Sequence, residues 1–179
     1  AFVYFVRYGI EDWIPTYLQM AKDHSFKESS VAWSLYEWAA VPGTILCGWM
    51  SDKVFHSRRA PATILFMTLT LLAVIGYGLN RSGPLWIDNV CLFTIGFLIY
   101  GPIMIIGLHA LDLVPKKAAG TAAGFTGFFG YVFGSSLAGW GVGKIADHWG
   151  WSGVFGTMVV CCLLTILFSA LTLGHQAES

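Results

Sequence analysis

Charged residues are scarce in this chain. Lys and Arg number 10, Asp and Glu number 10, and together they make up 11% of the 179 residues, whereas a typical soluble domain has about 25%. The formal net charge is zero and no basic stripe is present, which argues against nucleic-acid binding. Hydrophobic residues reach 56%, with a mean hydropathy of +0.66. The composition therefore predicts an all-α membrane protein that crosses the bilayer several times.

The short motifs that mark common enzyme classes are also missing. There is no glycine-rich loop ending in Gly-Lys-Ser/Thr, no His-Glu-x-x-His and no evident pair of nucleophile and base. The cysteines lie inside apolar runs, without the Cys-x-x-Cys or Cys/His spacing of metal and redox sites. We therefore expect no enzymatic activity, cofactor, metal or disulfide. We interpret these cysteines as small buried side chains: Cys47, Cys91, Cys161 and Cys162.

A third absence concerns the start of the chain. The sequence does not begin with Met, and it lacks the basic n-region and the small-residue cleavage site of a signal peptide. It opens directly on an apolar stretch. We therefore expect a fragment, namely the second half of a larger protein that is cut inside its first helix.

Long apolar runs divide the chain into six expected membrane spans. At about 1.5 Å per residue, each run is long enough to cross a hydrocarbon core of about 30 Å. We expect the second span to begin after Ser29 and Ser30, which resemble a helix cap, and the last two spans to be joined by a link over 144–151. The expected spans are residues 1–19, 29–50, 61–79, 86–113, 118–143 and 153–173.

Arg7 is the most informative residue, because it falls inside the first expected span. A permanent cation near the middle of a bilayer costs about 3 kcal/mol on insertion scales, so it is seldom found without a partner, a water-filled cavity or an anionic ligand. The spacing of Tyr4, Tyr8 and Glu11 places them on the same helical face. Three interpretations stay open: Arg7 binds a substrate anion, Arg7 forms a structural ion pair with Glu11, or Glu11 occupies Arg7 when the anion is absent.

The link after the second span carries a pattern that runs from Gly48 through Asp52-Lys53 to Arg58-Arg59. With one additional residue before the two arginines, it resembles the G-x-x-x-D-(R/K)-x-x-x-R-(R/K) loop of the major facilitator superfamily, which lies on the cytoplasmic side between the second and third spans of each six-span half. Gly permits close helix approach, while Asp and Arg form charged contacts between helix ends that break and re-form as the halves rock. An ordinary basic stop-transfer loop would not explain the Gly and the Asp.

This motif orients the chain better than its basic residues do. The two sets of links differ by five basic residues against four, which is a weak bias. The set that includes the motif carries Lys53, Arg58, Arg59, Lys116 and Lys117, and the other set carries Lys22, Lys27, Arg81 and Lys144.

Four separated segments narrow the resemblance. Residues 6–13, 42–53, 96–102 and 115–127 are similar, in this order, to the C-terminal half of bacterial organophosphate:phosphate antiporters. The resemblance implies that residues 1–179 form spans seven to twelve of a twelve-helix fold, with the N-terminal six-helix half as the missing partner.

The same resemblance implies a function and a location. The function is secondary active transport in the bacterial inner membrane, in which a small organophosphate, glycerol-3-phosphate foremost, is exchanged for inorganic phosphate by alternating access. The alternatives are a hexose-phosphate carrier, a carrier of another organic anion, or a transporter-like sugar-phosphate sensor.

Residue-by-residue matching to this family implies the site. Arg7 matches one of two arginines that clamp the substrate phosphate, and Tyr4, Tyr100 and Tyr131 match positions that line the same cavity. For each of these tyrosines, packing with a satisfied hydroxyl is nearly as good an explanation. Tyr8 is assigned to packing.

Asp12 and Glu37 are two further carboxylates within the expected spans. The resemblance implies that both act in gating or coupling while the cleft is closed, and a static buried pair is the alternative. The loop motif adds Gly48, Asp52 and Arg58 to the residues expected to act in gating.

The fifth expected span is rich in glycine. Gly120 with Gly124, and Gly130 with Gly134, are small-xxx-small pairs that let helix backbones approach each other. A flexible helix that rocks and tight packing alone explain these pairs equally well.

Overall fold

The computed structural model describes residues 1–80 and 83–176, and this part of the chain is almost entirely helical and contains no β-strand. The all-α class is therefore confirmed. Arg81, counted above among the basic residues of the links, lies outside the described residues. The elements in chain order are α1 (Phe2–Glu11), α2 (Ile14–Lys22), α3 (Phe26–Trp49), the π-helix η1 (Met50–Val54), α4 (Arg59–Leu79), α5 (Leu85–Asp112), the 3-10 helix η2 (Lys116–Ala118), α6 (Ala119–Phe129), the π-helix η3 (Gly130–Ser135) and α7 (Ser136–Gln176).

Helical structure covers each of the expected spans. Within the described chain, three segments are both long and apolar enough to cross a membrane: Arg59–Leu79, Leu85–Asp112 and Lys116–Leu173. The third segment contains the fifth and sixth expected spans. By contrast, α1 and α2 are each too short to cross alone, and α3 contains several Ser, Tyr and Trp residues as well as Glu37. The full count of spans therefore stays a prediction.

The first expected span is divided into two helices. α1 ends at Glu11, Asp12 and Trp13 form a turn, and α2 begins at Ile14. Pro15 explains the break: it has no N–H to donate to the carbonyl of Glu11, and its ring would clash with that carbonyl in a continuous helix. The expected span over 1–19 therefore consists of two helices with a turn between them.

α3 begins earlier than predicted, with Ser25 as its N-cap. The Ser25 Oγ accepts a hydrogen bond from the Glu28 N–H at 3.3 Å, and the Glu28 carboxylate accepts one from the Ser25 N–H at 2.8 Å, which forms a capping box. Hydrogen bonds from the hydroxyl and the N–H of Ser25 lower the pKa of the Glu28 carboxyl. The cap predicted at Ser29 and Ser30 is wrong, because their hydroxyls donate to carbonyls one turn back in the same helix.

The last two expected spans meet at a single glycine. Helical structure continues from the fifth expected span through Trp149, and the chain turns at Gly150, which has φ 66° and ψ −176°. A positive φ with an extended ψ is open to glycine and costly for other residues. The predicted link over 144–151 is therefore mostly helix, and one residue makes the turn.

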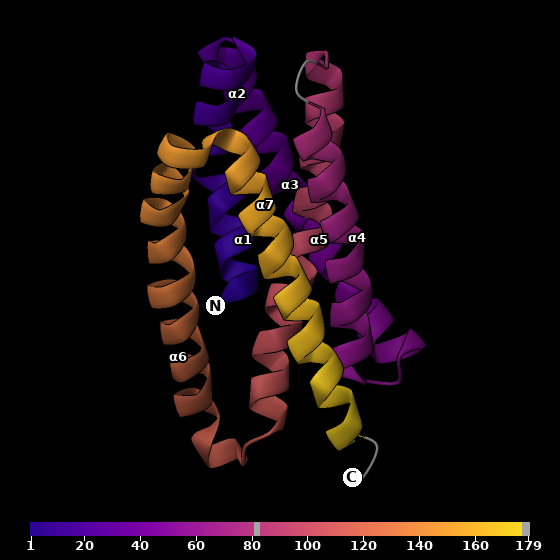
Figure 1. The fold of residues 1–179 in the computed structure, drawn as a ribbon. Helices are drawn as coiled ribbons and strands as arrows, with labels where there is room; N and C mark the ends of the chain where they lie inside the picture. The colour runs from indigo at the N-terminus through magenta and orange to yellow at the C-terminus, as the bar shows by residue number, and fades with distance from the viewer. Residues whose placement is uncertain (81–82, 177–179) are drawn as a thin grey trace.

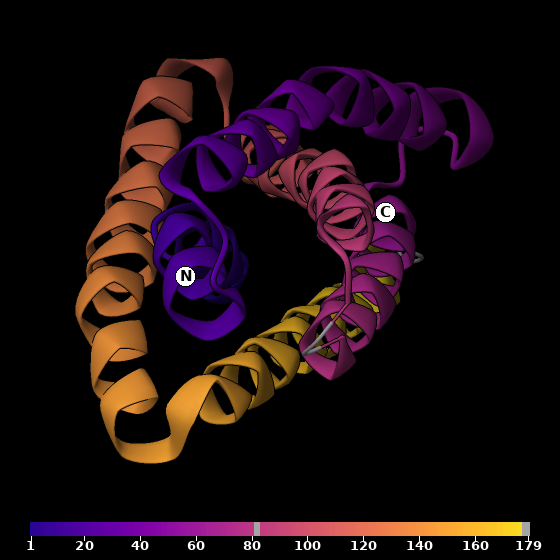
Figure 2. The same ribbon diagram turned by 90° about the horizontal axis from the view of Figure 1, so that it is seen from above.

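The helices run up and down, so that the links gather at two ends of the molecule (Figure 1). One end holds the α2–α3 link, the α4–α5 link and the Gly150 turn. The other end holds η1, the α5–α6 link and the end of α7. Seen from above, α1 lies between α5 and the rod formed by α6, η3 and the start of α7 (Figure 2). α1 is thus surrounded by other helices over much of its circumference.

α3 and α5 approach each other at backbone distance. A Cβ placed on Gly43 would lie 1.8 Å from the carbonyl oxygen of Phe97, and one placed on Gly96 would lie 2.2 Å from the carbonyl oxygen of Tyr36. Only glycine permits such an approach. Because lipid supplies no hydrophobic drive between helices, packing of this kind contributes much of their association. The contact also brings the rings of Tyr36 and Tyr100 to a centroid distance of 6.0 Å.

A buried ion pair joins the end of α2 to the start of α5. Lys22 Nζ contacts Asp88 Oδ1, and the two side chains are 2% and 0% exposed. His24 Nε2 lies 3.2 Å from the second Asp88 oxygen, and the Asn80 side chain donates to the first at 3.5 Å. In the sequence, Lys22 was counted among the basic residues of the links. Its burial follows instead from the packing of the ends of α2, α4 and α5 against one another.

We predict that Gly96→Ala destabilises the bundle, whereas Gly107→Ala on the same helix does not. A methyl group at position 96 meets the Tyr36 carbonyl, so α3 and α5 must separate at a cost of about 1–3 kcal/mol. A Cβ at Gly107 meets nothing within 4 Å, and alanine there removes a helix penalty of about 1 kcal/mol. Thermal unfolding in detergent, followed by tryptophan fluorescence, measures both variants. Equal midpoints would contradict the close contact.

A second prediction concerns the buried ion pair. Lys22→Met should lower the free energy of unfolding by about 3 kcal/mol, because it leaves the Asp88 carboxylate buried without its main cation. The double variant Lys22→Met/Asp88→Leu removes both charges and should regain most of that loss. Unfolding in detergent is again the measurement, with Lys27→Met as the control at an exposed lysine. A double variant as unstable as the single one would argue against the pair.

Candidate functional site

Arg7 lies at the centre of a chain of polar contacts that joins three helices. Its Nη2 donates a hydrogen bond to the Tyr100 hydroxyl on α5 at 3.0 Å. That hydroxyl in turn donates to Glu37 Oε1 on α3 at 2.6 Å. On α1 itself, Arg7 Nη2 lies 2.9 Å from Glu11 Oε2. The close contact of α3 with α5 therefore positions Tyr100, which contacts the guanidinium, and Glu37, which accepts the hydrogen bond from Tyr100.

Aromatic rings flank the same guanidinium. Its Cζ lies 4.4 Å from the ring centroid of Tyr8 and 4.6 Å from that of Tyr100, which allows cation–π attraction to both. The buried Tyr36 donates a hydrogen bond to the backbone carbonyl of Arg7 at 3.4 Å. The Arg7 side chain is 15% exposed. Protein groups thus replace much of the water around this cation.

Two polar atoms of the cluster have no hydrogen-bond partner within the described chain, namely Arg7 Nε and Glu11 Oε2. Glu11 Oε2 is nevertheless within ion-pair distance of Arg7 Nη2. The two observations agree if the contact is close but poorly aligned, so that charge rather than a directed hydrogen bond holds Glu11 in place. Arg7 therefore keeps a donor that no described group uses.

Three tyrosines form an aromatic group next to Arg7. The ring centroids of Tyr4 and Tyr131 are 5.6 Å apart, those of Tyr8 and Tyr131 are 6.1 Å apart, and those of Tyr4 and Tyr8 are 6.2 Å apart. Tyr131 belongs to η3, and π-helical turns are frequent at functional sites. α1 packs closely on this segment, because a Cβ on Gly134 would lie 2.3 Å from the Cβ of Tyr4.

The structure thus brings the expected substrate residues into one region. Arg7 contacts Tyr100 directly, and Tyr8 lies between Arg7 and the pair formed by Tyr4 and Tyr131. Tyr8 was assigned to packing, but the structure places it in this region. Its position next to Arg7 in the sequence, four residues after Tyr4, is the signal that could have shown this. That these residues bind substrate stays a prediction.

The two carboxylates expected to act in gating have different surroundings. Glu37 is half-buried and accepts the hydrogen bond from Tyr100, so it belongs to the Arg7 cluster. Asp12 is exposed at the turn between α1 and α2.

In the loop motif, Arg59 rather than Arg58 contacts the acidic residues. Arg59 Nη1 lies 2.7 Å from Asp52 Oδ1, and Arg59 Nε donates to Asp112 Oδ2 at 3.1 Å. Left-handed φ values of 51° and 64° at the two residues before Arg58 reverse the chain. This turn leaves Arg58 exposed and sets the first residue of α4 against Asp52. Gly48 faces α5, where an added Cβ would lie 3.2 Å from a methionine methyl group.

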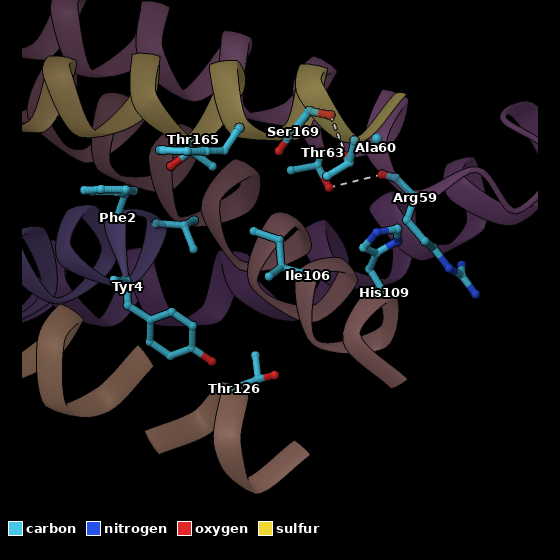
Figure 3. Close-up of a pocket in the computed structure, with 14 residues that line it drawn as sticks. Phe2, Tyr4, Arg59, Ala60, Thr63, Ile106, His109, Thr126, Thr165 and Ser169 are labelled. Atoms are coloured by element: carbon cyan, nitrogen blue, oxygen red, sulfur yellow. Dashed lines mark hydrogen bonds between the residues drawn. The ribbon is translucent and has the colours of Figure 1, made fainter. Parts of the chain in front are cut away.

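A cavity of about 410 Å³ begins beside Tyr4 (Figure 3). Residues of α1, α4, α5, α6 and α7 line it. In Figure 3 the Tyr4 hydroxyl points toward Thr126, while Arg59 and His109 lie together at the right, away from Tyr4. The cavity does not include Arg7, and Tyr4 is the residue that it shares with the expected site.

The arrangement around Arg7 suits the binding of an anion. A guanidinium offers planar donors that match the oxygens of a carboxylate or phosphate, and tyrosine hydroxyls can both donate and accept. Across residues 1–80 and 83–176, no group of three His, Cys, Asp or Glu side chains is placed to hold a metal ion.

Several known proteins are similar to this chain. It is 56% identical to the glycerol-3-phosphate transporter of Bacillus subtilis and 46% identical to that of Haemophilus influenzae, in both cases over 99% of this chain and 40% of the relative. It is 41% identical to a probable hexose phosphate transport protein of Chlamydia muridarum, over 99% of this chain and 39% of that protein. The chain therefore spans about 40% of the length of these relatives.

The sequence profile of the Major Facilitator Superfamily matches residues 1–139. The matched region contains the Gly48 to Arg59 loop, the Arg7 cluster and helices that are long and apolar enough to cross a membrane. This agrees with the resemblance carried by the sequence motifs. The chain belongs to the Major Facilitator Superfamily.

Proposed function

We propose that residues 1–179 are the C-terminal six-span half of a twelve-span carrier, and that the N-terminal half is its partner. The relatives support this, because they match nearly all of this chain with only about 40% of their own length. In carriers of this type the substrate site lies near mid-bilayer between the two halves. The proposed location is the bacterial inner membrane.

One face of α6 suits the contact with the other half. A Cβ on Gly120, Gly124 or Gly127 would meet nothing within 4 Å, so this glycine face is open, and Phe125 and Phe128 beside it are 65% and 58% exposed. Small residues of this kind allow a second helix to approach closely. The exposed apolar side chains elsewhere on the bundle are the surface proposed to contact lipid.

The proposed activity is exchange of a small organophosphate, glycerol-3-phosphate foremost, for inorganic phosphate. The observation that carries it is Arg7, a cation that is 15% exposed, that Tyr100 and Glu37 hold in place, and that has an unused Nε donor. A phosphate oxygen pair matches the planar donors of a guanidinium. The named activities of the relatives, glycerol-3-phosphate and hexose phosphate transport, agree in requiring recognition of a phosphate group.

Each residue of the cluster then has a role. Arg7 contacts the phosphate, Tyr100 orients Arg7 while Glu37 orients Tyr100, and Tyr4 and Tyr131 form the wall next to the cavity. Binding and release need only hydrogen bonds and charge, so transport proceeds without covalent chemistry.

Gating in this proposal uses the charged contacts at the end of the bundle that holds η1. The contacts of Arg59 with Asp52 and Asp112 tie the α3–α4 link to the end of α5, on the side that the loop motif assigns to the cytoplasm. Breaking these contacts would let the helix ends separate. The cavity that runs from Tyr4 toward Arg59 is the proposed path from the site to that side. Gly48, Arg58, Asp12 and Glu37 complete the group of proposed gating residues.

A hexose-phosphate carrier is the second candidate, favoured by the 41% identity to the Chlamydia muridarum protein. A chimera decides between them: this chain replaces the matching part of the Bacillus subtilis relative, and the product is reconstituted in vesicles loaded with phosphate. Counterflow is then compared for glycerol-3-phosphate, glucose-6-phosphate and phosphoglycerate. Preference for glycerol-3-phosphate supports the first candidate and preference for glucose-6-phosphate the second. Binding without counterflow of any of the three would favour a sensor.

We predict that Arg7→Lys in this chimera weakens phosphate exchange by about tenfold or more, because a lysine presents a point charge instead of a fork that meets two phosphate oxygens. The measurement is uptake of radiolabelled phosphate into phosphate-loaded vesicles at equal protein content. Lys27→Arg, a change between the same two residue types at an exposed position, should leave exchange unaltered. Normal exchange by Arg7→Lys would remove Arg7 from the phosphate site.

A further inference from the structure

Glu11 is the partner of Arg7 that comes from the same helix. The pair lies one turn apart on α1, with Glu11 Oε2 at 2.9 Å from Arg7 Nη2, and the two side chains are 19% and 15% exposed. A carboxylate at that position occupies the donor that an anion from solution would also seek. Glu11 and a phosphate oxygen therefore compete for the same group.

Glu11 is held less firmly than the other carboxylate of the cluster. Glu37 accepts a hydrogen bond of 2.6 Å from Tyr100, whereas Glu11 Oε2 is buried and has no aligned donor in the described chain. Displacing Glu37 would break a well-formed hydrogen bond, while displacing Glu11 loses a contact that rests on charge. A second anion of higher charge can offer that charge in its place.

The backbone around Glu11 is also suited to adjustment. Glu11 is the last residue of α1, and Pro15 provides no N–H for its carbonyl, so one helical hydrogen bond is missing at this point. Its side chain can move away from Arg7 without disrupting a continuous helix.

We propose that Glu11 is an internal counter-anion, which neutralises Arg7 in the empty carrier and yields to the substrate phosphate when it binds. This rests on the proposed function, in which Arg7 binds phosphate. An unpaired guanidinium in a closed, dry cleft is costly. With Glu11 in place, Arg7 and Glu11 form a neutral pair in the empty site, and the carrier can switch between its inward-facing and outward-facing states without substrate. Glu11 thus sets the ratio of net phosphate efflux to phosphate exchange.

The test uses the chimera described above with inorganic phosphate as the probe and two readouts. One is the phosphate concentration that gives half-maximal exchange, and the other is the ratio of net phosphate efflux into phosphate-free buffer to exchange. Glu11→Gln removes the competing charge, so both the half-maximal concentration and the ratio should fall by about tenfold. Asp147→Asn, which neutralises an exposed carboxylate on α7, should change neither.

Glu11→Asp is the second variant, which keeps the charge on a shorter side chain and should shift both readouts in the same direction by a smaller factor. A higher half-maximal concentration, or net efflux and exchange that fall in proportion, would mean that Glu11 supports the site or the fold and would overturn the proposal. Unchanged readouts with an essential Arg7 would overturn the Glu11 role alone. A chimera without phosphate exchange, or with exchange indifferent to Arg7→Lys, would overturn the proposed function and this inference with it.

Discussion

The backbone contact between α3 and α5 is the constraint on which the site depends. Inside a bilayer, helices gain little from burying apolar surface against one another, so their positions are set by how closely their backbones fit. Gly43 and Gly96 allow a fit so close that any side chain there would overlap the facing carbonyl. One consequence is mechanical, since α3 and α5 must move as one body. Another is chemical, because Glu37 and Tyr100 keep a fixed relation to each other.

That pair stabilises a cation that is largely removed from water. Arg7 cannot lose its charge, so the protein has to provide the stabilisation that water would otherwise give. Tyr100 accepts from the guanidinium with its oxygen and donates its single proton to Glu37, which polarises the hydroxyl toward Arg7. Glu11 supplies a second negative charge, and two rings cover the faces. The cluster thereby holds Arg7 ready for an anion without leaving it unpaired.

Composition, apolar runs and motif order were enough to predict the family and the helical class, because hydropathy and short motifs are local properties of the sequence. The Pro15 break and the Ser25 capping box also follow from local rules, because each depends on residues at most four positions apart. The burial of Lys22 could not be predicted from the sequence, because its partner Asp88 lies 66 residues away and only tertiary packing brings the two together. Likewise, Arg59 rather than Arg58 contacts the acidic residues because of the left-handed turn at His56 and Ser57, and these residue types do not predict such a turn.

The break at Pro15 leaves α1 and α2 joined by a turn instead of a continuous helix. α2 is anchored at its far end by Lys22 and Asp88, whereas α1 is held by its packing on η3 and by the contact of Arg7 with Tyr100 on α5. Arg7 lies about five residues below this turn, which is a lever arm of about 8 Å. A rotation of about 10° would therefore displace the guanidinium by roughly 1.4 Å, enough to break a hydrogen bond. A change of angle between α1 and α2 would therefore alter the contacts of Arg7 with Tyr100 and Glu11.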